Sequence, residues 1–200
     1  PSIALAQPAS PPAAPATIRP TENLVVEGIP EIPAALADEV RRYTEARSAT
    51  FVGWHPTRPE MLISTRFGNT AQIHEVRMPG GDRRQLTFFA EPIGAADWDP
   101  RDGKFFLFTR DTGGNEFGQI YRLDIATGDV TRLSDGGRSQ NGGWEWDPAG
   151  ERIAYTSTRR NGADRDVWVI DPRDPSTDRL VVENAGGGWS VLDWSPDGSK

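Results

Sequence analysis

One loop of the sequence gathers an unusual number of reactive side chains. Within seven residues it holds a guanidinium, two carboxylates and an amide, carried by Arg110, Asp111, Glu116 and Asn115, around the pair Gly113-Gly114. Such groups can bind a charged partner or the end of a peptide, and loops carry binding residues more often than buried elements do. The competing interpretation is a plain turn, in which the glycines set the geometry and the charges pair locally or face water.

The other polar candidates fit catalysis and metal binding poorly. Asp97, Asp99 and Asp102 are spaced like a calcium loop, but the bidentate glutamate that such a loop needs is missing. The two histidines, His55 and His74, have no nucleophile patterned around them. The 200 residues hold no cysteine and no G-x-S-x-G nucleophile elbow. We therefore expect no metal site, no cofactor and no catalytic residue in this sequence.

The overall composition narrows the classes of partner. The formal net charge is −7, whereas a nucleic-acid binder needs clustered lysine and arginine to displace counterions. No apolar run approaches the ~18–20 residues of a membrane-spanning helix. The 21 glycines and 17 prolines favour many short strands and turns. We expect neither nucleic-acid binding nor a membrane span.

A repeated Trp-x-Pro motif supplies the elements that would position these groups. It occurs at Trp54, Trp98, Trp146 and Trp194, in steps of 44, 48 and 48 residues. Each of the first three copies is followed by a polar turn, a short β-rich run, a loop with arginine and glycine or asparagine, and two further short strands. Counting the segment that enters each tryptophan, every repeat holds four strands, which is typical of a β-propeller blade.

The predicted fold is therefore all-β: an incomplete β-propeller over residues 48–200, with about three four-stranded blades and the start of a fourth. Closed propellers of four to eight blades need roughly 180–360 residues of repeats, so the ring is expected to be open here and to expose its terminal blade faces. In this fold the 110–116 loop joins the second and third strands of a blade. It opens on the same rim as the connections between blades.

The repeat also gives the two histidines structural roles. His55 stands in the slot that Asp99, Asp147 and Ser195 hold in the other repeats, and we expect it to bond the backbone of its own turn. His74 lies in a strand position, where packing or partial exposure is expected rather than catalysis.

Residues 21–47 form a lead-in to the repeats. The segment Pro33–Arg47 predicts one amphipathic helix, with Leu36, Val40 and Tyr43 on a single face. The apolar segment Leu24–Ile29 predicts a lone strand, which would either complete the last blade or pack on a partner domain.

The first 20 residues are rich in proline and alanine and predict an extended segment. The run Ala4-Leu5-Ala6 has the form of a signal-peptidase site, and a plain linker is the alternative. We favour export, which places the protein in the periplasm or outside the cell.

The repeats resemble those shared by TolB and the prolyl oligopeptidase family, most plainly in the string Trp194-Ser195-Pro196-Asp197-Gly198-Ser199-Lys200. Repeat motifs alone are weakly specific. Two further segments are similar to bacterial members of the peptidase family, namely Gln85-Leu86-Thr87-Phe88-Phe89 and Gly113-Gly114-Asn115-Glu116-Phe117. The resemblance covers about residues 21–200.

The resemblance implies a two-domain serine peptidase. In that family an N-terminal propeller lies over the active site as a lid and size filter, and a C-terminal α/β-hydrolase domain, absent from this sequence, carries the Ser, Asp and His. The chain would then be the non-catalytic, substrate-gating part of an exported enzyme that cleaves short peptides. The alternative is a TolB-like periplasmic propeller that binds other proteins and catalyses nothing.

The same resemblance suggests a role for the loop. In related dipeptidyl peptidases, acids on the propeller hold the free amine of the substrate, and Glu116 would be an analogue by loop type alone, because the dipeptidyl-peptidase motif is missing. On this basis Arg110, Asp111, Asn115 and Glu116 are predicted to contact substrate or the partner domain.

Overall fold

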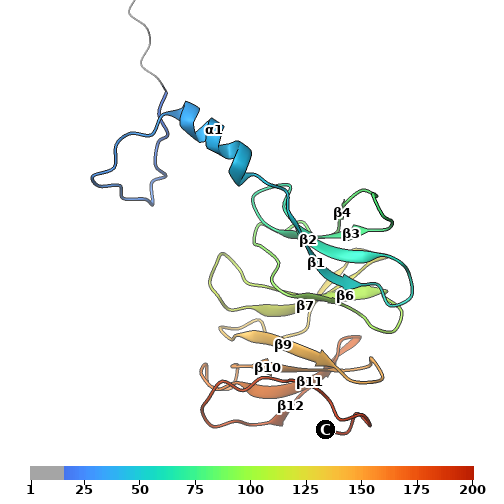
Figure 1. The fold of residues 1–200 in the computed structure, drawn as a ribbon. Helices are drawn as coiled ribbons and strands as arrows, with labels where there is room; N and C mark the ends of the chain where they lie inside the picture. Colours follow the sequence, from blue (N-terminus) through green and yellow to red (C-terminus); the bar gives the residue numbers. More distant parts are fainter. Residues whose placement is uncertain (1–15) are drawn as a thin grey trace, which may run out of the picture. The chain divides into compact units, whose positions relative to one another are not determined.

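The computed structural model of the chain describes residues 16–200 (Figure 1). Compact packing divides the chain into two units, with the boundary between Ala46 and Arg47. Within the described residues, no helix is both long and apolar enough to cross a membrane.

The second unit consists of three antiparallel sheets of four strands each, stacked in chain order (Figure 1). Blade 1 contains β1 (Ala49–Trp54), β2 (Met61–Thr65), β3 (Gln72–Val76) and β4 (Arg84–Gln85). Blade 2 contains β5 (Ala96–Trp98), β6 (Phe105–Arg110), β7 (Gln119–Asp124) and β8 (Val130–Arg132). Blade 3 contains β9 (Asn141–Trp146), β10 (Ile153–Ser157), β11 (Asp166–Asp171) and β12 (Asp174–Val182). The predicted incomplete propeller with four-stranded blades is confirmed.

Strand alternation gives every blade two apolar faces, because successive side chains point to opposite sides of a sheet. Blades 1 and 2 share one core, formed by Leu62, Ile73, Ile93, Trp98, Phe106, Phe108, Tyr121 and Leu123. Blades 2 and 3 share the other, formed by Phe105, Leu107, Ile120, Leu133, Trp144, Ile153, Tyr155 and Ile170. Neighbouring residues of one strand, such as Phe105 and Phe106, therefore serve different cores, and blade 2 is covered on both faces.

Two buried glutamines fix the connections between blades. Gln72, which opens β3, donates to the carbonyl oxygens of Phe89 and Glu91 at 3.1 and 2.9 Å and accepts the Phe89 N–H at 3.1 Å. Gln119, which opens β7, donates to the carbonyls of the next connection and accepts from its Ser134 hydroxyl at 2.6 Å. Each connection on this rim is thus bonded to the third strand of the preceding blade.

The lead-in differs from its prediction. Helix α1 covers Ala34–Thr44, shorter than the expected Pro33–Arg47, and none of its residues is buried. The apolar face of Leu36, Val40 and Tyr43 is exposed. The segment 24–29 pairs with no strand within residues 16–200, and its pairing with a last blade or a partner domain stays a prediction. A single bridge between Thr17 and Pro33 forms instead.

The opening of the fourth blade is present as an anchor and a turn. The Ser195 N–H donates to the Lys200 carbonyl at 2.6 Å, and the Gly198 N–H donates to the Ser195 carbonyl at 2.8 Å. No strand enters Trp194 between residues 183 and 193. The run Ala4-Leu5-Ala6 lies outside the described residues.

Candidate functional site

The loop after β6 is held in shape by its own side chains. The Asp111 carboxylate accepts the Glu116 N–H at 3.0 Å, and the Asn115 side-chain oxygen accepts the Phe117 N–H at 2.9 Å. Gly113 and Gly114 both have a positive φ, which glycine adopts without strain. Asp111 and Asn115 therefore act as turn residues, which matches the local-pairing interpretation of the loop.

Glu116 differs from the rest of the loop. Its φ is +64°, and it is the only residue other than glycine with a positive φ in the described part of the chain. A side chain in this conformation costs of order 1–2 kcal/mol. The Glu116 carboxylate is exposed, and no hydrogen bond or ion pair within residues 16–200 reaches it. The loop thus holds a free negative charge on a strained backbone.

Arg110 and Glu91 join this loop to blade 1. Glu91 lies in the connection between blades 1 and 2, where its carboxylate binds Arg110 at 3.3 Å and accepts the Gly113 N–H at 3.1 Å. That N–H is the main cause of the lowered pKa of Glu91. The Arg110 guanidinium lies 4.5 Å above the Phe89 ring and 4.9 Å above the Tyr121 ring. Arg110 therefore fastens the loop in place and is not free to bind a ligand by itself.

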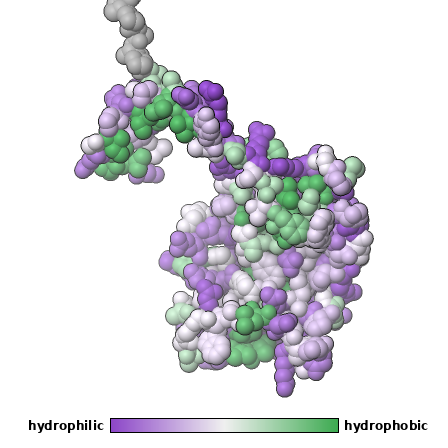
Figure 2. All heavy atoms as spheres, in the orientation of Figure 1, coloured by the Kyte–Doolittle hydropathy of each residue, from purple (hydrophilic) through white to green (hydrophobic). Residues whose placement is uncertain are grey.

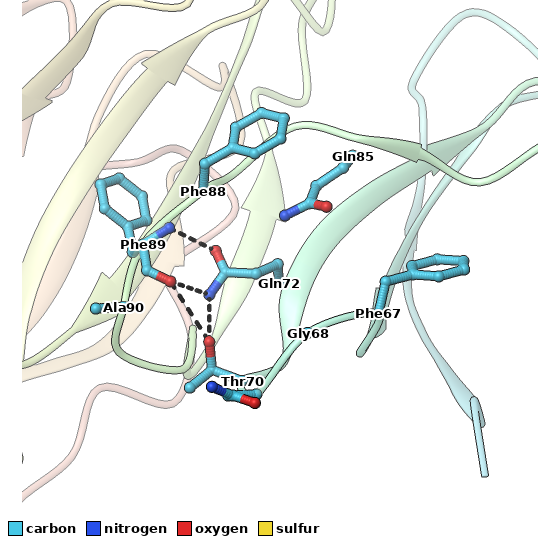
Figure 3. Close-up of a pocket in the computed structure, with 9 residues that line it drawn as sticks. Phe67, Gly68, Thr70, Gln72, Gln85, Phe88, Phe89 and Ala90 are labelled. Atoms are coloured by element: carbon cyan, nitrogen blue, oxygen red, sulfur yellow. Dashed lines mark hydrogen bonds between the residues drawn. The ribbon is translucent and has the colours of Figure 1, made fainter. Parts of the chain in front are cut away.

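A cavity of about 360 Å³ lies beside this junction (Figure 3). Its apolar walls include Phe67, Phe88 and Phe89, and its polar lining includes Thr70, Gln72 and Gln85. The Phe88 side chain is 76% exposed and that of Phe67 is 47% exposed, whereas Phe89 packs on Phe108 below. Exposed aromatic rings beside fixed polar groups suit an apolar side chain carried on a polar backbone.

The sequence did not identify this part of the site. Phe88 and Phe89 were noted only for their resemblance, and Glu91 was not singled out. The pair Phe88-Phe89 was a usable signal in the sequence. Two adjacent phenylalanines shortly after the last strand of a blade lie at a rim, where only one of the two rings can enter the core.

Both histidines have the structural roles predicted for them. His55 Nδ1 accepts the Thr57 N–H at 3.2 Å, and its ring packs 4.8 Å from that of Trp98. His74 is buried in β3, with Nδ1 3.1 Å from the Gln72 carbonyl oxygen. Burial is the main cause that lowers the pKa of each imidazole.

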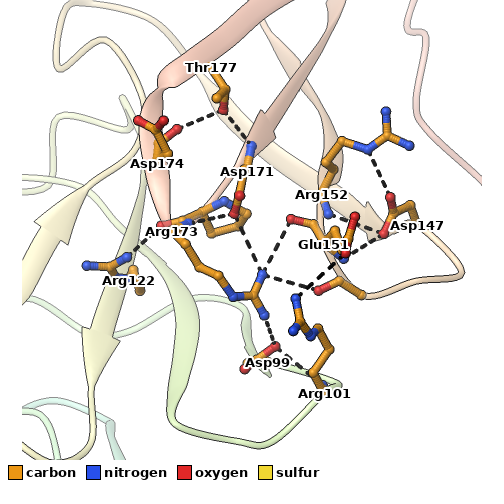
Figure 4. A network of polar contacts seen from close by, with 12 residues as sticks. Asp99, Arg101, Arg122, Asp147, Glu151, Arg152, Asp171, Arg173, Asp174 and Thr177 are labelled. Atoms are coloured by element: carbon orange, nitrogen blue, oxygen red, sulfur yellow. Dashed lines mark hydrogen bonds and ion pairs between the residues drawn. The ribbon is translucent and has the colours of Figure 1, made fainter.

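The acids around Trp98 are used for contacts between blades. Asp97 accepts the Trp146 indole N–H at 3.0 Å. Asp99 accepts from Arg173 of blade 3 at 2.6 Å, and Arg173 also donates to the Gly150 carbonyl at 3.2 Å (Figure 4). Burial is the main cause that raises the pKa of Asp99. The Lys104 side chain is the main cause that lowers the pKa of Asp102, to about 2.

Comparisons with known proteins show which structures this chain is similar to. No family model matches the chain, and no curated protein matches it. A putative TolB from Agrobacterium tumefaciens is similar in structure, with a TM-score of 0.57 and 26% identity over 72% of this chain. TolB from Acinetobacter baumannii has a TM-score of 0.55 and 22% identity over 76%. A prolyl endopeptidase has a TM-score of 0.51 and 15% identity over 68%.

The chain covers only part of each of these structures: 50% of the Agrobacterium protein, 36% of the Acinetobacter protein and 22% of the prolyl endopeptidase. The similarities show that the chain has a TolB-like β-propeller fold.

Proposed function

We propose that the chain is the substrate-gating, non-catalytic propeller part of an exported serine peptidase that acts on short peptides. One observation carries the proposal. The two segments that resemble the peptidase family, 85–89 and 113–117, are far apart in sequence but are linked through Glu91 and Arg110. Glu91 accepts the Gly113 N–H and binds Arg110, whose guanidinium lies over the Phe89 ring. The first segment lines the aromatic cavity with Phe88 and Phe89, and the second carries the exposed carboxylate of Glu116.

This arrangement suits a short peptide in chemical terms. The cavity beside Phe67 and Phe88 would take an apolar side chain. The exposed carboxylate of Glu116 would attract a free amino terminus. Arg110, Asp111 and Asn115 would hold the loop in position rather than touch the peptide. The catalytic Ser, Asp and His would come from a hydrolase domain of the same longer polypeptide.

A fluorophosphonate probe tests the proposal on that longer polypeptide. The probe reacts with an activated serine, so we expect one adduct, and peptide mapping should place it outside residues 1–200. A longer polypeptide that carries no serine adduct would refute the peptidase assignment. An adduct within residues 1–200 would equally contradict the non-catalytic role of this chain.

The second candidate is a TolB-like propeller that binds other proteins. It is favoured by the higher identity and TM-scores of the two TolB structures compared with the prolyl endopeptidase. Under this alternative the longer polypeptide should remain unlabelled by the probe and should show no peptide cleavage.

A further inference from the structure

His74 lies next to three of the residues that line the cavity in Figure 3. The centroids of its ring and the Phe67 ring are 5.3 Å apart, and Nδ1 is 3.1 Å from the Gln72 carbonyl oxygen. On the neighbouring strand β4, Gln85 is its direct partner in the register of the sheet. His74 is only 1% exposed, so these neighbours must accommodate any change in its charge.

The surroundings of His74 fit the neutral imidazole. A carbonyl oxygen only accepts hydrogen bonds, so the contact with Gln72 places the hydrogen of the neutral ring on Nδ1. Nε2 then carries a lone pair, and it is buried with no hydrogen-bond partner in residues 16–200. Protonation would turn Nε2 into a donor without an acceptor, which is costly in a buried position.

Two arginines near the His74 ring oppose a positive charge on it. Arg83, in the turn between β3 and β4, donates to the Arg47 carbonyl oxygen at 2.9 Å. The Arg47 guanidinium lies 5.0 Å from the centroid of the Phe67 ring, on which His74 packs. Burial is the main cause that lowers the pKa of His74, and the charge of Arg83 lowers this pKa further.

The strands beside His74 supply no negative charge to it. In the register of the sheet it lies opposite Ile63 of β2 and Gln85 of β4, which are both neutral. Glu75, the next residue of β3, points to the opposite side of the strand, and its carboxylate is paired with two arginines. A protonated His74 would therefore carry an unpaired charge for as long as its ring stays buried.

We propose that His74 is a pH-sensitive support for the Phe67 wall of the cavity: the neutral imidazole holds Phe67 in place, and the protonated imidazole displaces it. Phe67 can move, because it is 47% exposed and lies on the loop between β2 and β3, whereas Phe89 packs on the buried Phe108. Figure 2 shows apolar surface over blade 1, which this movement would rearrange. An arrangement in which water reaches the imidazole binds a proton better than the closed one, so acid shifts the population toward it.

The consequence for binding rests on the proposed function. If the cavity takes an apolar side chain of a peptide, the chain binds that side chain at neutral pH and releases it in acid, because Phe67 forms part of the wall. His74 is then a positioning residue, which touches the wall and not the peptide.

Fluorine NMR of the 200-residue chain, labelled with para-fluorophenylalanine, tests the proposal during acidification from about pH 8 to about pH 4, a range that spans the ordinary histidine pKa of about 6.5. The signals of Phe67 and Phe88 are assigned from Phe67→Tyr and Phe88→Tyr. We expect the Phe67 signal to shift with the midpoint of the His74 titration, which is followed through the imidazole proton resonance. Phe88 lines the same cavity without a ring contact to His74, and its signal is the internal control that should not follow this midpoint.

Two variants assign the response to one histidine. His74→Gln removes the titrating group, and the pH dependence of the Phe67 signal should disappear. His55→Gln is the matched control, because it removes the other of the two histidines and should leave the dependence unchanged. A wild-type Phe67 signal that ignores the His74 titration would overturn the proposal whether or not the variants fold, and so would a response that persists in folded His74→Gln.

A neutral ligand separates this inference from the proposed function. N-acetylphenylalanine amide has no free amine or carboxylate, so only the cavity can respond to pH. We expect it to bind the wild type several-fold more weakly at the acid end of the range, and His74→Gln equally at both ends. If Phe67 follows His74 but the amide does not bind, the pH-sensitive support stands and the proposed peptide site fails. Binding of the amide with a pH-independent Phe67 signal would overturn the support and leave the peptide site in place.

Discussion

At Gly53 the protein lacks a hydrogen bond that another copy of the repeat makes, namely the bond from the tryptophan of a Trp-x-Pro motif to the preceding blade. In the equivalent position Asp97 accepts the indole N–H of Trp146, whereas the Trp98 indole is buried without an acceptor. The backbone of Gly53 is not in the left-handed region, and a Cβ there has ordinary contacts. The position therefore accepts a side chain.

We predict that Gly53→Asp stabilises the fold by about 1 kcal/mol, the net value of one hydrogen bond. Urea unfolding measures the change, and Gly53→Ala is the control, because it stiffens the unfolded chain equally well but offers no acceptor. Gly53→Asn adds an amide oxygen without a charge, which separates the hydrogen bond from the cost of burying a carboxylate. Equal stability of the alanine and aspartate variants would contradict the prediction.

Glu116 links strain to the proposed binding role. Glycine at this position relieves the positive φ, so Glu116→Gly should stabilise the fold by about 1 kcal/mol. Glu116→Gln keeps the strain but removes the charge, and it should leave the stability unchanged. Thermal unfolding of the two variants distinguishes these effects.

In the longer polypeptide, we expect both Glu116 variants to weaken binding of peptides with a free amino terminus roughly tenfold, the value of one charge-assisted contact. N-acetylated peptides of the same sequence serve as the control and should bind equally to the wild type and both variants. If acetylated and free peptides respond alike, the carboxylate does not recognise the amine.

At the scale of the element, the rim connections depend on single buried side chains. The Gln119 side chain accepts from Ser134 Oγ and the Gly136 N–H and donates to the carbonyls of Gly137 and Ser139. Gln119→Ala leaves several of these groups unpaired and should cost about 3 kcal/mol in unfolding free energy. The control, Gln140→Ala, removes one exposed contact with Arg165 and should stay within about 0.5 kcal/mol.

The buried carboxyl group of Asp99, which contacts Arg173 of blade 3, should make the free energy of unfolding depend on pH. Burial raises the folded-state pKa of Asp99, so its contribution to stability is full below the unfolded pKa and is lost as pH rises through the folded value. Asp99→Asn removes this loss and can still accept from Arg173. The stability of Asp99→Asn relative to wild type should therefore increase from about pH 4 to pH 7, as followed by denaturant unfolding. A pH-independent difference would contradict the raised pKa of Asp99.

The sequence predicted the strands of the three blades, where each repeat supplies pairing neighbours. It was less informative for the lead-in, where no such neighbours repeat. The Trp-x-Pro spacing located all three blades, because every strand there has a partner one turn away. Segment 24–29 forms no strand within residues 16–200, because β propensity needs a pairing neighbour, which the described chain does not place there. The helix was predicted with one apolar face, but amphipathic spacing cannot say whether a partner covers that face.

The site was predicted only in part for a related reason. Residue type alone could select the candidates Arg110, Asp111, Asn115 and Glu116. Spacing could not show that the Arg110 guanidinium binds Glu91 and lies over two aromatic rings. Nor could it separate Glu116 from its neighbours, because the strain at that residue depends on how the loop closes. Resemblance pointed to segments 85–89 and 113–117, and the contacts of Glu91 explain why they belong together.

At the scale of the whole molecule, the two cores give the three blades unequal support. Blade 2 contributes to both cores, and its residues Phe106, Leu107 and Phe108 have no exposed surface. Blades 1 and 3 each bury one face in a shared core, and blade 1 exposes Phe51 and Trp54. In a repeat protein, stability is approximately the sum of each repeat and its contacts with its neighbours. The described chain should therefore unfold from its ends.

Hydrogen–deuterium exchange of the 200-residue chain measures this gradient directly. We expect the slowest exchange in β6 and β7 of blade 2, intermediate exchange in the central strands of blades 1 and 3, and the fastest in residues 16–46, where α1 buries no residue. The longer polypeptide is the control, since a neighbouring blade that covered Phe51 and Trp54 would slow exchange in blade 1 much more than in blade 2. Uniform protection of all three blades in the 200-residue chain would mean that they unfold as one cooperative unit, and the nearest-neighbour account of their stability would then be wrong.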